Sequence, residues 1–154
     1  MGVLTADMRR VIEEQQLSFV ATVSPDGWPN LSPKGSTRVY DDDHLIFVDI
    51  TSPTTVANLL ANPRIEINVV DPIVRRGYRF RGRAEVFERG EAFERLLAFM
   101  RAAGSTTAVN SLVLVNVERA LPVWSPAYDQ GRTEAEVVAL WEPNYEALKA
   151  RRRT

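Results

Sequence analysis

The chain has 154 residues, 45% of them hydrophobic and 25% charged, which is the composition of one globular domain spanning residues 1–154. It contains no cysteine and a single histidine, His44, which excludes disulfides, thiol nucleophiles and metal sites built from several thiolates or imidazoles. A formal net charge of -1 and the lack of a long apolar run argue against a nucleic-acid partner and against a membrane span. We therefore expect a soluble, cytoplasmic protein without a metal site.

Residue patterns in the first third predict a helix followed by strands. Apolar residues at helical spacing predict a short helix over residues 5–15, with Thr5 as its N-cap. Alternation over 17–23 predicts a strand, and the turn residues at 24–27 allow the chain to reverse into a hairpin. After an irregular stretch at 28–38, the nearly continuous apolar run at 45–50 predicts a strand buried on both faces.

The remaining residues predict more strands, separated by helices. Ser52 and Pro53 mark the start of a helix that continues to about Ala61, and strands are expected over 64–70 and 78–87. A helix is expected over 91–103, and a strand over 111–117 that continues after a kink toward Trp124. The capping-box spacing at 133–136 predicts a last helix, interrupted at Pro143, that reaches the basic end at 151–153.

These elements favour one fold class. Strands joined mostly by tight turns, without regular alternation with helices, favour an antiparallel arrangement over a doubly wound parallel sheet. We predict a mainly β (α+β) fold, a six-stranded antiparallel barrel with peripheral helices.

The start of the helix at Ser52 is the first candidate site. Free backbone N–H groups and the positive end of the helix dipole lie there, beside the hydroxyls of Ser52, Thr54 and Thr55, with Asn58 one turn further. This arrangement suits an anion such as a phosphate. The alternative is that Ser52 simply caps its own helix.

A second candidate is Lys34, one of only two lysines in the chain. It lies in a segment that also contains Ser32, Gly35 and Ser36. An antiparallel neighbouring strand could bring Lys34 to the helix start, where a phosphate generally needs a cation. The alternative is a solvated lysine in a loop.

Other motifs allow two interpretations each. Arg79, Arg81 and Arg83 form a ladder that either pairs with Glu66 or Glu85 across the sheet or contacts a ligand. The aromatic run at 123–129 either stacks on a flat ring or covers the edge of the core. No glycine-rich phosphate loop is present, no residue is identified for proton transfer, and His44 is expected in an exposed turn.

The order of three segments resembles the pyridoxamine 5'-phosphate oxidase-related family of FMN-binding flavoproteins. The segments are FVATVSPDGWPNLSPKGS, DDDHLIFVDITSPTTVANLLANPRIEINVV and YRFRGRAEVFE, within about residues 17–88. The tail segment WSPAYDQG resembles one subgroup of the family. The resemblance implies a split β-barrel and a homodimer with two FMN sites at the subunit interface.

The resemblance also implies which residues would bind the cofactor. Hydroxyls and basic side chains would hold the flavin phosphate, and backbone at the end of the buried strand would meet the ring edge. The implied residues are Ser32, Lys34, Gly35, Ser36, Val48, Asp49, Ile50, Ser52, Thr54, Thr55 and Asn58.

Two departures from the family pattern narrow the function. True oxidases of the family have an arginine and a lysine where this chain has Thr54 and Thr55, so Lys34 or Arg81 would have to supply the charge. The C-terminal segment with which those oxidases bind pyridoxal phosphate has no counterpart here. We therefore expect an FMN-dependent oxidoreductase of unknown substrate, unlike the true pyridoxamine phosphate oxidases.

Three alternatives stay open from the sequence. The first is a reductase that uses the deazaflavin F420 in place of FMN, and the second is a non-catalytic flavin-binding or electron-transfer module. The third, a haem-handling protein, is disfavoured because His44 is the only histidine.

Overall fold

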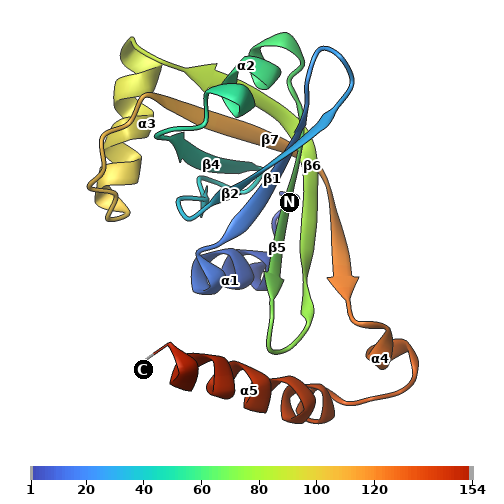
Figure 1. Ribbon diagram of the computed structural model, residues 1–154. Coiled ribbons are helices and arrows are strands. Elements are labelled where there is room, and N and C mark those ends of the chain that lie inside the picture. Colours follow the sequence, from blue (N-terminus) through green and yellow to red (C-terminus); the bar gives the residue numbers. More distant parts are fainter. Residues whose placement is uncertain (1, 153–154) are drawn as a thin grey trace.

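Seven antiparallel strands form one curled sheet, a half-barrel with helices around it, in the computed structural model, which describes residues 2–152 (Figure 1). The strand order is β2-β1-β5-β6-β7-β4-β3. The elements are α1 (Ala6–Gln15), β1 (Ser18–Val23), β2 (Pro29–Lys34), β3 (Arg38–Val39), β4 (His44–Asp49), α2 (Pro53–Ala61), β5 (Arg64–Asp71), β6 (Arg76–Phe87), α3 (Glu91–Ala102), β7 (Ser111–Trp124), α4 (Pro126–Asp129) and α5 (Glu134–Arg151). The predicted antiparallel α+β barrel class is confirmed.

The predicted number of six strands is wrong by one. The stretch at 28–38, which looked irregular, contains the regular strand β2 and the two-residue strand β3. A strand of two residues is too short to show a periodicity of its own, and the two prolines of β2 conceal its pattern. Pro29 and Pro33 are tolerated because β2 is an edge strand of the sheet.

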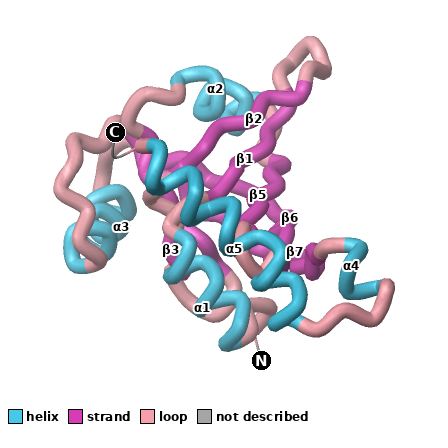
Figure 2. The backbone as a smooth tube through the Cα atoms, turned by 60° about the horizontal axis from the view of Figure 1, so that its bottom comes forward, coloured by secondary structure: helices cyan, strands magenta, loops and turns pink. Residues whose placement is uncertain are grey.

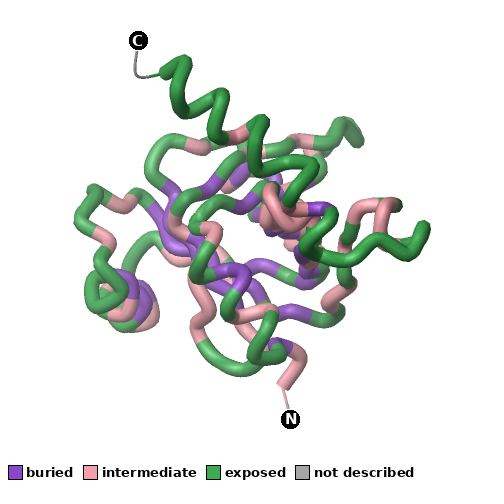
Figure 3. The backbone as a smooth tube through the Cα atoms, turned by 90° about the horizontal axis from the view of Figure 1, so that it is seen from below, coloured by how far each residue is buried: buried purple, intermediate pink, exposed green. Residues whose placement is uncertain are grey.

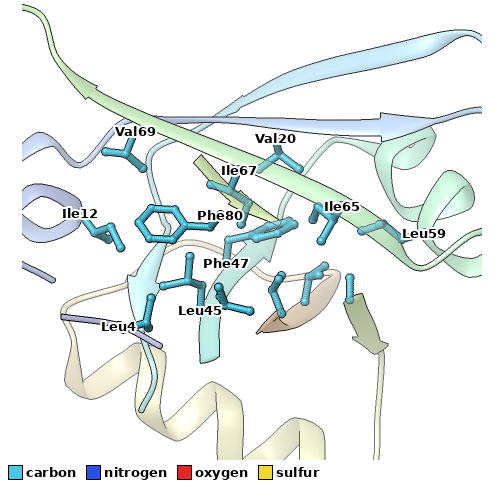
Figure 4. Packing of buried hydrophobic residues seen from close by; sticks show 14 of the residues in the cluster. Leu4, Ile12, Val20, Leu45, Phe47, Leu59, Ile65, Ile67, Val69 and Phe80 are labelled. Atoms are coloured by element: carbon cyan, nitrogen blue, oxygen red, sulfur yellow. The ribbon is translucent and has the colours of Figure 1, made fainter. Parts of the chain in front are cut away.

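β4 separates two hydrophobic clusters. Leu45 and Phe47 face the larger cluster inside the barrel, where Phe47 and Phe80 are fully buried (Figure 4). Ile46 and Val48 point the other way and pack with residues of α3 such as Leu96. The predicted burial on both faces is confirmed, and the two clusters are the reason for the unbroken apolar run.

β1 is a strand as predicted, but its polar face is the inner one. Ser18, Val20 and Thr22 are buried, whereas Phe19 and Val23 are each 41% exposed. The inner polar groups have partners: the Ser18 hydroxyl lies 2.7 Å from that of Thr37. The exposed side chains Leu17, Phe19, Val23 and Leu31 form an apolar surface that we call the β1–β2 outer face.

The N-termini of α1 and α5 are capped as predicted. Thr5 Oγ1 accepts a hydrogen bond from the Met8 N–H at 3.4 Å, and Thr133 Oγ1 accepts one from the Glu136 N–H at 3.3 Å. α5 then runs without interruption through Pro143, so the predicted break there is wrong. A proline removes one backbone hydrogen bond, and in this exposed helix that loss does not end the helix. The prediction for Arg153 lies outside the described residues.

The segment after β7 was not predicted as a helix but forms the short α4. Its side chains attach to the turn between β5 and β6: Tyr128 Oη donates to the Val74 carbonyl at 2.6 Å, and the Arg76 guanidinium lies 3.7 Å from the Tyr128 ring centre. The aromatic run was predicted either to stack on a flat ring or to cover the edge of the core. In the structure its side chains contact the chain itself, which agrees with the second interpretation. None of the helices over residues 2–152 has the length and apolarity needed to cross a membrane.

Candidate functional site

Lys34 lies at the centre of a small polar cluster. It is the last residue of β2, on the same face as Ser32, and only 7% of it is exposed. Its ammonium group donates to Ser32 Oγ at 2.8 Å and to Ser52 Oγ at 2.5 Å. The antiparallel hairpin and the start of α2 thus bring together two segments that the sequence singled out separately. Lys34 is not a solvated lysine in a loop.

Ser52 occupies the N-cap position of α2 without capping it. Its hydroxyl makes no hydrogen bond to the backbone of the first turn, and its own N–H donates to Asp49 Oδ1 at 2.8 Å. The interpretation of Ser52 as a cap of its own helix is therefore wrong. The first turn of α2 has no side-chain cap, which leaves backbone donors beside the Lys34 ammonium group.

The electrostatics of Lys34 are those of a cation without a full counter-ion. Burial removes water from the ammonium group and lowers the pKa of Lys34 below its usual 10.5, while the Asp49 carboxylate acts in the opposite direction. An anion that docked against Lys34 would stabilise its charged form. The cluster of Ser32, Lys34 and Ser52 is therefore suited to an anionic group.

A cavity of about 390 Å³ opens beside this cluster. Its walls come from the ends of β2 and β4, the start of α2, and the end of α3 with the loop that follows. The predicted site residues that line it are Lys34, Gly35, Ser36, Val48, Ile50 and Ser52. This volume lies within the range of small-molecule and cofactor sites.

Several backbone groups at the end of β4 are already bonded within the chain. The Val48 N–H donates to Ser36 Oγ at 3.1 Å. The Asp49 and Ile50 carbonyls accept from Asn110, at 2.9 Å from its N–H and at 2.5 Å from its side-chain amide. The strand end is thus held rigidly, with fewer free groups than the family resemblance implies. The roles of Val48, Asp49 and Ile50 stay predictions.

Thr55 and Asn58 lie on the other side of α2, which is turned toward the sheet. Both are 2% exposed and belong to a network of side chains. The Asn58 amide donates to Thr22 Oγ1 at 3.0 Å, and the Asn30 amide donates to Thr22 Oγ1 at 3.2 Å and to Thr55 Oγ1 at 3.3 Å. Thr54, by contrast, is exposed. The helix start therefore divides the predicted residues between two environments.

Arg81 is not among the residues that line the cavity. It lies on the outward side of β6 and pairs with Glu66 of the neighbouring strand, as the cross-strand interpretation predicted. Within one chain the second cation at the cavity is Arg38. Its guanidinium donates to the Thr37 carbonyl at 2.8 Å.

The sequence analysis missed Arg38 and the loop after α3. Met100 and residues 103–107 line the cavity. Arg101 holds this loop, since its Nη1 donates to the Ser105 and Thr107 carbonyls, both at 2.8 Å. The one signal available was the polar, small-residue sequence GSTT directly after a predicted helix.

Comparison with known proteins identifies the family. The model of the pyridoxamine 5'-phosphate oxidase family matches residues 4–140. The chain belongs to this family. HupZ of Group A Streptococcus, whose crystal structure is known, is 36% identical with a TM-score of 0.71, and the alignment covers 79% of this chain and 94% of HupZ.

Two solved structures of lower sequence identity share the fold, and one further protein is similar in sequence over part of its length. An FMN-binding protein of Syntrophomonas wolfei is 19% identical with a TM-score of 0.66, over 79% of this chain and 87% of that one. An F420 reductase is 20% identical with a TM-score of 0.57, over 76% of this chain and 98% of that one. The uncharacterized protein MJ0282 of Methanocaldococcus jannaschii is 29% identical over 89 residues, which span 56% of this chain and only 58% of MJ0282.

Proposed function

We propose that residues 1–154 form one flavin-binding barrel and that the cluster of Ser32, Lys34 and Ser52 holds the phosphate of FMN. The observation that carries this proposal is the buried ammonium group of Lys34, which two hydroxyls position beside an uncapped helix start. A phosphate there would accept hydrogen bonds from the ammonium group, the hydroxyls and the free N–H groups of α2. The residues present therefore fit the phosphate end of the cofactor.

The rest of the cavity fits a flat ring. Pro33, Val48, Ile50 and Met100 provide apolar surface, and the loop at 103–107 provides small polar side chains. Bound FMN would supply hydride or electron transfer, and the protein would orient it and exclude water. The only titratable side chains that line the cavity are Lys34 and Arg38, so this chain supplies positive charge there and no evident general acid.

We propose that the protein is an oxidoreductase of this type, with the electron-transfer module as its alternative. Steady-state turnover separates the two. An enzyme reduces its flavin catalytically with NAD(P)H and passes the electrons to a small acceptor. A carrier shows flavin reduction only with a partner protein.

F420 is the second candidate cofactor. It is supported by the small number of cations that line the cavity. A phosphate monoester such as that of FMN carries about -1.5 to -2 charges at pH 7, whereas the phosphodiester of F420 carries one. Thr54 and Thr55 add no charge, and one buried lysine with Arg38 at a distance balances a diester more easily than a monoester. The similarity to an F420 reductase agrees with this possibility.

A homodimer is part of the proposal. The β1–β2 outer face is apolar and exposed, with Leu31 at 64% and Leu17 at 50%. It shares strand β2 with the cavity, whose wall includes Pro33. A second copy that covers this face would bury its apolar side chains next to the wall of the cavity.

The test is to identify the chromophore of the purified protein. We expect an absorption spectrum of oxidised flavin, and FMN on chromatography after denaturation. A protein that is colourless but is stabilised against heat by F420 and not by FMN would move the assignment to the alternative. A protein that takes up neither would overturn the proposed function.

A further inference from the structure

A second cavity, of about 270 Å³, lies where the turn between β5 and β6 meets α4 and α5. Figure 2 shows α4 and the start of α5 beside β6 and β7. This cavity shares no lining residue with the cavity beside Lys34. Apolar and aromatic side chains surround one charged group in it, and the residues concerned are Val70, Val123, Trp124, Pro126, Trp141 and the charged Arg75.

Backbone and ring contacts fix the walls of this second cavity. The Ser125 N–H donates to the Arg75 carbonyl at 2.9 Å, which ties the end of β7 to the turn. The Arg75 guanidinium lies 3.7 Å from the Trp141 ring centre, which ties α5 to the same turn. Elsewhere α5 is largely exposed (Figure 3), and Val137 is the one buried residue among its described residues. The cavity is therefore already formed at the point where α5 is attached.

Arg75 is a cation without a counter-ion. Among residues 2–152 its guanidinium makes no ion pair, and its Nε is buried without a hydrogen-bond partner. Two carboxylates of the neighbouring helices have other partners: Asp129 accepts from the Trp124 indole N–H at 2.8 Å, and Glu134 pairs with Arg76. The positive charge in the cavity is thus left for a ligand.

The turn itself does not require an arginine at position 75. Arg75 has a φ of 60°, in the left-handed region that favours glycine. Asp71 Oδ1 accepts from the N–H groups of Ile73 and Val74, at 2.8 and 3.0 Å, and so fixes the turn without the Arg75 side chain. Strained backbone positions of this kind cluster at binding sites.

We propose that this second cavity binds a small aromatic carboxylic acid, whose ring packs against Trp124 and Trp141 and whose carboxylate pairs with Arg75. The two tryptophans are 49% and 36% exposed, so both rings have free surface. An arginine that stacks on a ring keeps its N–H donors at the edge of its plane, where a carboxylate accepts two parallel hydrogen bonds.

The size of the cavity limits the ligand to a small one. At about 270 Å³ it is smaller than the cavity beside Lys34 and lies below the range of most drug-sized ligands. A single aromatic ring with a short acidic side chain matches it. The proposal concerns a site separate from the flavin site and does not depend on it.

Titration with cinnamate, followed in NMR spectra of the isotope-labelled full-length protein, tests this proposal. The chain has three tryptophans, each with one indole N–H signal. Trp28 is 73% exposed and does not line the cavity, so it serves as an internal control. We expect the signals of Trp124 and Trp141 to shift and saturate together while that of Trp28 stays in place. Equal shifts of all three would indicate unspecific adsorption and overturn the proposal.

Cinnamamide, the neutral counterpart of cinnamate, tests the role of the charge without any substitution. We expect cinnamate to bind the wild type at least tenfold more tightly than cinnamamide, because a charged pair with arginine is lost in the amide. Equal dissociation constants would contradict the pairing with Arg75. We also expect the cinnamate shifts to persist when FMN is added in excess. Their loss would place the probe in the flavin site and overturn the proposal.

Arg75→Gln and Arg76→Gln form a matched pair of variants. Both remove one arginine from the same turn, and each guanidinium lies 3.7 Å from a ring centre, that of Trp141 for Arg75 and that of Tyr128 for Arg76. Arg76 does not line this cavity. We expect Arg75→Gln to weaken cinnamate binding at least tenfold and Arg76→Gln to weaken it less than about threefold. Equal losses would show that binding depends on overall charge or on the attachment of α5, which contradicts direct pairing with Arg75.

Discussion

The two sides of α2 carry polar groups of opposite character. Toward the sheet, Thr55 and Asn58 join Thr22 in a buried network in which the amide donors have hydroxyl acceptors. Toward the cavity, the buried Lys34 donates hydrogen bonds to two neutral hydroxyls and has no direct ion pair among the described residues. The first side is complete without a ligand, whereas the second is arranged for an anion. The difference shows that hydroxyl-rich sequence at a helix start does not by itself distinguish structure from binding.

We expect the largest effect on stability from a substitution in the buried network between α2 and the sheet. Thr22→Val keeps the shape of a side chain that is 2% exposed but leaves the Asn58 amide without its acceptor. We expect a loss of about 2 kcal/mol in the free energy of unfolding, the usual cost of an unsatisfied buried donor. Urea denaturation measures it, with Thr54→Val on the exposed side of the same helix as the control. Equal losses would show that the network is not what stabilises this side.

The next largest effect distinguishes Thr5, which caps its helix, from Ser52, which does not. Thr5 caps α1, so Thr5→Ala should cost about 1 kcal/mol of unfolding free energy. Ser52→Ala removes no cap, but it takes away one hydrogen-bond acceptor of the Lys34 ammonium group, so its cost should disappear when Lys34 is already replaced by Met. A loss of about 1 kcal/mol for Ser52→Ala that persists in the Lys34→Met protein would indicate that Ser52 stabilises its helix after all.

The smallest effect on stability should come from Lys34 itself. Burial of a charge without an ion pair costs desolvation free energy, and an apolar side chain of similar length avoids this cost while it loses the hydrogen bonds to Ser32 and Ser52. We expect the ligand-free Lys34→Met protein to unfold within about 1 kcal/mol of the wild type, or to be more stable. A loss of stability comparable to that of Thr22→Val would contradict a site built for a ligand.

The difference in unfolding free energy between the wild type and Lys34→Met should depend on pH, in a direction that follows from the pKa of Lys34. The folded pKa of Lys34 is lowered because burial desolvates the ammonium group, while the unfolded chain keeps a value near 10.5. Between these two values the unfolded state binds the proton that the folded state has released, so the free energy of unfolding rises with pH. The wild type should therefore gain stability relative to Lys34→Met as the pH increases toward 10.5. A constant difference over this range would show that the pKa is not shifted.

Local patterns predicted most of the fold. The apolar run of β4, the alternation of β6, the N-cap at Thr5 and the capping box at Thr133 all depend on neighbouring residues, and the structure confirms them. Alternation alone could not tell which face of β1 is buried, because an inner face with Ser18 and Thr22 is stable only when distant residues provide hydrogen-bond partners.

The candidate site was predicted in part for the same reason. Hydroxyl and lysine chemistry identified Lys34 and Ser52, but only the curl of the sheet brings the end of β2, at one edge, to the segment after β4, near the other edge. The loop at 103–107 reaches the cavity from the far end of α3, at a sequence distance that no local pattern spans. Thr55 and Asn58 face the sheet, whereas Lys34 lies beside the cavity. This difference also depends on how α2 packs on the sheet.

The central claim is that Lys34 holds the phosphate of a flavin, and comparing FMN with riboflavin tests it most directly, since riboflavin lacks the phosphate. Fluorescence titration would give the dissociation constants of both ligands for the wild type, Lys34→Met and the control Lys149→Met, which changes the other lysine. We predict that Lys34→Met weakens FMN binding about 10- to 100-fold, as expected for a lost charged hydrogen bond, and riboflavin binding by less than about 3-fold. Equal losses for the two ligands, or an equal effect of Lys149→Met, would contradict the claim.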